Sequence, residues 1–120
     1  MGHAVLMDIK VYKTKVSKSD LESLAQAGYG DMIKGVVDIE QKILALGGEL
    51  HADCEEILLK QGSKQVDLWG FNIYPTRNKE ERLEYTSFIN IRPKQGNLQM
   101  EIKDEKLQEQ IKTVVDHLID

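Results

Sequence analysis

The sequence predicts a single α+β domain over residues 1–120, with an antiparallel sheet of about three to five strands and two or three helices packed on one face. Three observations support this prediction. The length of 120 residues is usual for one domain, and no linker or internal repeat is present. Residues 67–74 and 82–92 alternate with period two and lie close in sequence, which predicts an antiparallel hairpin. Residues 31–46 and 105–118 carry apolar stripes of helical period.

Composition and charge narrow the class of protein further. Hydrophobic residues make up 41% of the chain and charged residues 30%, as in a folded globular domain. The net charge of −4 argues against a nucleic-acid partner or an anionic membrane surface. The single cysteine, Cys54, has no disulfide partner in the chain, and no apolar run could span a membrane. We therefore expect a cytoplasmic protein, with residues 1–6 as a leader ahead of Met7.

The first predicted elements are a short strand and a short helix. Residues 8–12 alternate apolar and polar side chains, which is typical of an edge strand. Ser19 and Glu22 have the spacing of a capping box, in which each side chain satisfies a backbone N–H of the first turn. A helix is therefore expected from about Asp20 to Gly28, where the glycine ends it.

Residues 31–46 have the strongest helical pattern in the chain. The apolar stripe consists of Met32, Val36, Ile39, Ile43 and Leu46. A stripe this wide predicts a helix buried against the sheet and ended by Gly47 and Gly48. Gly35 costs helix stability, so its use indicates a close approach to a neighbouring backbone. The side chains expected to pack on this helix are Trp69, Phe71, Ile73, Ile89 and Ile91.

The segment that follows can be interpreted in two ways. Asp53 and Glu56 have capping-box spacing, which favours a two-turn helix that stops at Gly62. Ile57 and Leu59 would equally suit the inward positions of a strand. Residues 54–61 are therefore helix or strand, with the helix preferred.

Two further elements are expected after the hairpin. Leu98, Met100 and Ile102 alternate, which predicts a short strand. Asp104 is placed to cap a final helix over residues 105–118. The buried face of this helix would consist of Leu107, Ile111, Val114, Val115 and Leu118.

Three motifs give the chain a resemblance to a known family. They are GGELHAD at 47–53, DLWG at 67–70 with Asn72 and Tyr74 after it, and INIRP at 89–93 followed by QGN. These motifs are similar to those of a small prokaryotic family catalogued only as proteins of unknown function. The resemblance implies no activity, so a site has to be argued from chemistry.

The first candidate site consists of His51, Asp53 and Glu55. Imidazole and carboxylate groups this close in sequence can bind a divalent ion or form a general-base pair. That chemistry would suit a metal-assisted or His-based hydrolase. In the structural alternative Asp53 caps a helix, Glu56 is its box partner and His51 is a surface or strand-end residue.

The second candidate site consists of Arg92, Asn90, Gln95 and Asn97. A guanidinium beside several amide side chains is rich in hydrogen-bond donors, so it would suit an anionic small molecule. In the alternative, Arg92 pairs with an internal carboxylate. The carboxylates available for that pair are Glu49, Asp67 and Glu84.

These candidates lead to three hypotheses of function. The first is a small cytoplasmic binding module with a polar pocket near His51, Asp53 and residues 92–97. The second is a hydrolase that uses the turn at His51. The third is a homo-oligomer that buries Phe88, Leu68 and Tyr74 across a shared sheet face. The sequence names neither a cofactor nor a ligand.

Overall fold

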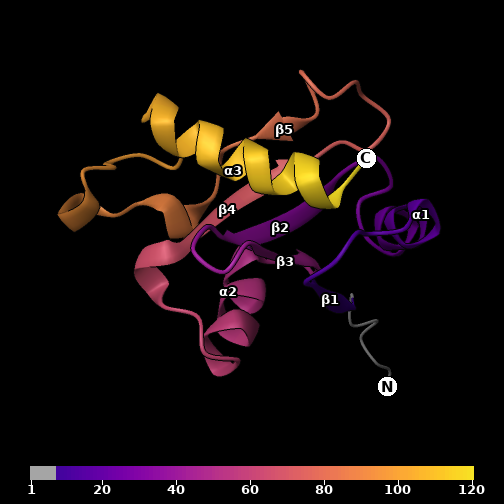
Figure 1. The fold of residues 1–120 in the computed structure, drawn as a ribbon, viewed down its shortest axis with the longest axis horizontal. Coiled ribbons are helices and arrows are strands. Elements are labelled where there is room, and N and C mark those ends of the chain that lie inside the picture. Colours follow the sequence, from indigo (N-terminus) through magenta and orange to yellow (C-terminus); the bar gives the residue numbers. More distant parts are fainter. Residues whose placement is uncertain (1–7) are drawn as a thin grey trace.

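The computed structural model describes residues 8–120 as an antiparallel sheet of five strands with three helices (Figure 1). The strand order is β1–β3–β2–β4–β5, and all neighbouring strands are antiparallel. The predicted α+β class is confirmed. The leader expected at residues 1–6 lies outside the described residues. Within residues 8–120, no helix has the length and apolar character needed to cross a membrane.

Most of the predicted helices and strands are present close to their expected positions. The strands are β1 (Ile9–Tyr12), β2 (Ile33–Asp38), β3 (Ile43–Gly47), β4 (Leu68–Ile73) and β5 (Leu83–Glu84). The helices are α1 (Lys18–Ala27), α2 (His51–Lys60) and α3 (Glu105–Leu118). Three 3-10 turns lie at Gln65–Asp67, Phe88–Asn90 and Pro93–Gln95. The helical interpretation of residues 54–61 and the final helix are therefore confirmed.

The long helix expected over residues 31–46 is wrong, because this segment forms the hairpin of β2 and β3. Val36 and Val37 are both 0% exposed, although they point to opposite faces of the sheet. A strand that is buried on both faces needs a nearly continuous apolar run, and part of such a run will match helical spacing. The β-branched side chains in β2 favour the strand.

Gly35 shows why the hairpin needs a glycine at its centre. A Cβ atom there would lie 2.5 Å from Cζ of Phe71 and 2.8 Å from Cδ2 of Leu46. The close neighbours are therefore side chains, not the backbone that the sequence predicted. The absence of a side chain at Gly35 leaves the space that the Phe71 ring occupies.

The helices cover both faces of the sheet, whereas the sequence placed them on one. Helices α1 and α3 pack on the face that carries Val37 and Phe71. Helix α2 packs on the opposite face, which carries Val36 and Leu68. Figure 1 shows α3 crossing the sheet near β2 and β4, with α2 next to β3. The expected packing of Phe71 against Val36 is therefore wrong, since the two side chains lie on opposite faces.

The long strand predicted at residues 82–92 is also wrong beyond its first residues. Strand β5 ends at Glu84, and the chain continues through an isolated bridge between Thr86 and Glu101 and then two 3-10 turns. Residues 98–102 take part in that bridge but form no strand. The part of the chain from residue 85 to residue 103, called the Arg92 segment below, is therefore mostly irregular.

Candidate functional site

The Arg92 segment contains the whole second candidate site, and Arg92 is bound internally. Its side chain is 8% exposed, and all five of its N–H groups donate to protein acceptors. The acceptors are the carbonyls of Gln65, Leu68 and Ile89 and the side chains of Glu55 and Gln95, at 2.5 to 3.3 Å. The guanidinium also lies 4.6 Å from the centroid of the Trp69 ring. An anion could bind Arg92 only by displacing one of these partners.

The internal carboxylate that pairs with Arg92 is Glu55, at 3.3 Å. None of the three carboxylates expected from the sequence takes this position. Burial lowers the pKa of the Arg92 guanidinium, and the charge of Glu55 opposes that change. Because Glu55 lies on α2, the pair ties the irregular segment to a helix of the core.

Asn90 takes the place of a strand residue beside β4. Its side-chain oxygen accepts a hydrogen bond from the Gly70 N–H at 2.8 Å, and its amide nitrogen donates to the Gly70 carbonyl at 2.9 Å. Asn90 is 0% exposed. A Cβ atom on Gly70 would lie 2.6 Å from Cβ of Ser87, so the glycine allows the two segments to approach. One side-chain amide thus supplies the pairing that β5 no longer provides.

Gln95 and Asn97 have similar structural roles. The Gln95 amide donates to the Val66 carbonyl at 3.1 Å. The Asn97 amide donates to the carbonyls of Asn90 and Gln99, both at 2.8 Å, and its oxygen accepts from the Lys103 N–H. The structure thus brings the four residues of this candidate site together, as hydrogen-bond partners of the irregular backbone.

The first candidate site is divided between the two sides of α2. His51 is 9% exposed, and its Nε2 donates to the Phe71 carbonyl at 2.9 Å. Asp53 follows two residues later, about 200° around the helix axis, and is exposed. Glu55 is engaged with Arg92. Within residues 8–120, no group of three or more His, Cys, Asp or Glu side chains is arranged to hold a metal ion.

Two nucleophile or base candidates near the start of α2 are buried, and burial shifts the pKa of each toward its neutral form. Burial lowers the pKa of His51, although its hydrogen bond to the Phe71 carbonyl works in the opposite direction. Burial raises the pKa of the Cys54 thiol to about 12, and the thiol donates to the Gly47 carbonyl. Cys54 therefore has the properties of a small buried side chain.

An apolar surface lies directly beside Arg92. It is called the Phe88 surface here and consists of Val66, Phe88, Ile89 and Ile91. Phe88 is 77% exposed, Val66 57% and Ile91 43%. These residues line a groove of about 590 Å³ together with Glu55, Arg92 and Lys94. Leu68 and Tyr74, which the oligomer hypothesis placed on the same face, do not line this groove, and Leu68 is 0% exposed.

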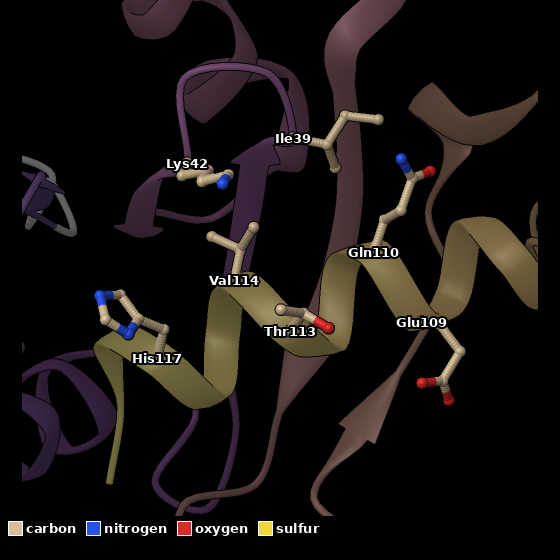
Figure 2. A pocket seen from close by; sticks show the side chains of 7 residues that line it. All are labelled: Ile39, Lys42, Glu109, Gln110, Thr113, Val114 and His117. Atoms are coloured by element: carbon tan, nitrogen blue, oxygen red, sulfur yellow. The ribbon is translucent and has the colours of Figure 1, made fainter.

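A second groove lies between α3 and the turn that joins β2 to β3 (Figure 2). It has a volume of about 480 Å³ and is called the α3 groove below. Its lining residues are Ile39, Lys42, Glu109, Gln110, Thr113, Val114 and His117. No sequence pattern indicated this groove, because Lys42 fell inside the helix predicted for residues 31–46.

Comparison with known proteins identifies a family whose description gives no activity. A family model described as "Protein of unknown function (DUF5674)" matches residues 10–118. No curated protein matches the chain. No solved structure matches it either.

Proposed function

Since the chain belongs to the DUF5674 family, whose description gives no activity, we propose a function from the geometry: the protein is a binding module that self-associates through the Phe88 surface. The observation that carries the proposal is Phe88, an aromatic side chain that is 77% exposed beside a groove. Contiguous apolar patches of this kind mark interaction sites on proteins that are otherwise well packed.

A second copy of the chain is the partner that fits this surface best. A two-fold dimer joins the same patch on both subunits, so the patch must carry both a projecting group and a hollow. The Phe88 surface has both, since Phe88 is 77% exposed and also lines the groove. In a two-fold pair, each Phe88 ring can enter the groove of the other subunit.

The apolar area is sufficient for the centre of such an interface. Burial of one aromatic side chain removes roughly 150–250 Å² from water. Val66 and Ile91 add to this area on either side of Phe88. An interface of standard size buries about 800 Å² on each partner, with an apolar centre and a polar rim. Lys94 and Gln95, both exposed, would belong to the rim.

The bonds of Arg92 support this proposal over an anionic ligand at the same place. They fix the Arg92 segment before any partner arrives, so the apolar side chains need little ordering on association. An anion at Arg92 would have to replace one of five existing acceptors. The residues that the sequence predicted to form a polar pocket therefore hold an apolar binding surface in place.

The experiment measures the molar mass of the protein in solution by sedimentation equilibrium across the micromolar concentration range. We expect the parent protein to be a dimer that dissociates on dilution. Phe88→Asp should be monomeric at every concentration, because dimerisation would bury the new carboxylate at the centre of the interface. Its melting temperature, measured below the dissociation concentration, should equal that of the parent monomer, since Phe88 is exposed there.

The matched control is Leu50→Asp, which places the same charge on another exposed apolar residue. Leu50 is 55% exposed at the start of α2 and does not line the groove. This variant should dimerise like the parent. A parent protein that is monomeric throughout, or a Phe88→Asp variant that remains dimeric, would contradict self-association through this surface.

A further inference from the structure

The α3 groove combines an apolar floor with polar side chains from two separate elements. Ile39 and Val114 form the floor, and Val114 is 5% exposed. Gln110, Thr113 and His117 lie along one side of α3, because they are spaced three and four residues apart. Lys42 lies across from them, on the opposite wall (Figure 2). The volume of about 480 Å³ lies within the range of small-molecule sites.

The turn that carries Lys42 is held firmly in place. Asp38 is 1% exposed, and its carboxylate accepts hydrogen bonds from the backbone N–H groups of Glu40 and Gln41 at 2.9 and 2.8 Å. The Ser63 hydroxyl donates to the same carboxylate at 2.6 Å. The Lys42 N–H donates to the Asp38 carbonyl at 2.8 Å. The position of Lys42 is therefore set by the fold before a ligand binds.

Lys42 also has an unfavourable backbone conformation for its residue type. Its φ is 59°, and among residues 8–120 no other residue except glycine has a positive φ. Glycine or asparagine would adopt this left-handed conformation at lower cost. Backbone strain of this kind persists where the rest of the structure enforces it, and it is common at ligand sites. The conformation directs a lysine side chain over the groove (Figure 2).

The cationic end of the groove has no internal anion. Within the described part of the chain, neither the Lys42 ammonium nor the side chains of Gln110, Thr113 and His117 have a hydrogen-bond or ion-pair partner in the protein. By contrast, Lys112 on the same helix is paired with Asp116 at 2.5 Å. The one carboxylate of the lining, Glu109, points away from Lys42 in Figure 2. The groove therefore presents an unpaired positive charge beside an apolar floor.

We propose that the α3 groove binds a small amphipathic anion, with a carboxylate or phosphate group at Lys42 and His117 and an apolar body over Ile39 and Val114. Lys42 supplies the opposite charge and a charge-assisted hydrogen bond to the anionic group. His117 donates a second hydrogen bond from the last turn of α3. Gln110 and Thr113 remain for polar substituents on the body of the ligand. The site is separate from the Phe88 surface, so neither proposal depends on the other.

The first test compares four probes by thermal shift and calorimetry: phenyl phosphate, benzoate, inorganic phosphate and benzyl alcohol. A ligand that binds the folded state alone raises the melting temperature by mass action. We expect at least one of the two aryl anions to raise it, and to bind roughly tenfold more tightly than inorganic phosphate or benzyl alcohol, which each lack one half of the ligand. The aryl anion with the higher affinity identifies the anionic group. No response to either aryl anion at millimolar concentration overturns the proposal.

The second test uses Lys42→Gly, with Lys64→Gln as a control. Glycine removes the cation and relieves the left-handed strain, so the unliganded variant should melt at or above the temperature of the parent. Its affinity for the aryl anion should fall by about tenfold or more. Lys64→Gln removes an exposed cation outside the groove and should bind like the parent. An unchanged affinity in Lys42→Gly, or an equal loss in Lys64→Gln, contradicts the proposal.

Discussion

The Arg92 segment and the α3 groove both gather polar side chains near an apolar surface, but the two regions use them in opposite ways. Every N–H of Arg92 has a protein acceptor, whereas the Lys42 ammonium has none among the described residues. An irregular backbone leaves peptide groups without partners, and buried side chains must then supply them. In the α3 groove, the peptide groups of the helix bond one another, and Asp38 and the Asp67 carbonyl satisfy those of the turn. The side chains that line the groove therefore remain available for a ligand.

The largest effect expected from this difference is on Arg92 itself. Arg92→Gln removes the partner of a partly buried carboxylate, Glu55, and leaves the carbonyls of Gln65 and Leu68 without their donor. The free energy of unfolding should fall by roughly 3–5 kcal/mol in a urea titration. Lys94→Gln, an exposed neighbour, should change it by less than about 0.5 kcal/mol. Equal effects of the two substitutions would show that Arg92 does not hold the segment together.

A smaller loss is expected at Asn90. Asn90→Ala leaves the buried N–H and carbonyl of Gly70 without partners, which should cost about 1–3 kcal/mol of unfolding free energy. Asn78 serves as the control, because its amide donates only to the exposed Glu81 side chain. Asn78→Ala should change stability by less than about 0.5 kcal/mol. If Asn90→Ala changes the free energy of unfolding as little as Asn78→Ala does, the Asn90 amide does not replace strand pairing at Gly70.

The third effect depends on pH and tests whether His51 belongs to the buried core. The pKa of His51 lies below its ordinary value of 6.5 in the folded protein. As the pH falls, the unfolded chain therefore takes up a proton on His51 at a higher pH than the folded protein does. The stability that is present above pH 6.5 is then lost as the pH falls below this value. Between about pH 7 and 5 the slope should reach at most about 1.4 kcal/mol per pH unit.

Urea titrations at several pH values measure this slope. His51→Gln should reduce it, because the buried imidazole is gone. A slope that persists unchanged in His51→Gln would have to come from other groups, and His51 would then not be held neutral by the fold.

The difference between α3 and the β2–β3 hairpin explains how far the fold could be predicted. Both segments match an apolar period of three and four residues. In α3 the positions between the stripe residues are all polar or charged, so only one face can be buried. In the hairpin, residues 43–46 are four consecutive apolar residues and all are buried. A continuous apolar run fits a strand covered on both faces, although periodicity alone cannot distinguish that arrangement from a helix.

The candidate site could be predicted in composition but not in role. The sequence indicated that Asn90, Arg92, Gln95 and Asn97 act together, and they do contact one another through the segment. Several of their acceptors lie outside it, on Gln65, Val66, Leu68 and Gly70. The Glu55–Arg92 pair joins residues that are 37 positions apart. No local sequence pattern indicates such a contact. An arginine whose N–H groups are all bonded within the protein and an arginine available to a ligand therefore look the same in the sequence.

One measurement tests the contrast between the two regions most directly: a titration of the isotope-labelled parent protein with phenyl phosphate, followed through its backbone amide NMR signals. We predict that the signals of residues 39–42 and 110–117 move with a common saturating dependence on concentration. The signals of residues 88–97 should stay in place, because every donor of Arg92 is already engaged. Movement of the signals of residues 88–97, with those of the α3 groove unchanged, would contradict the account.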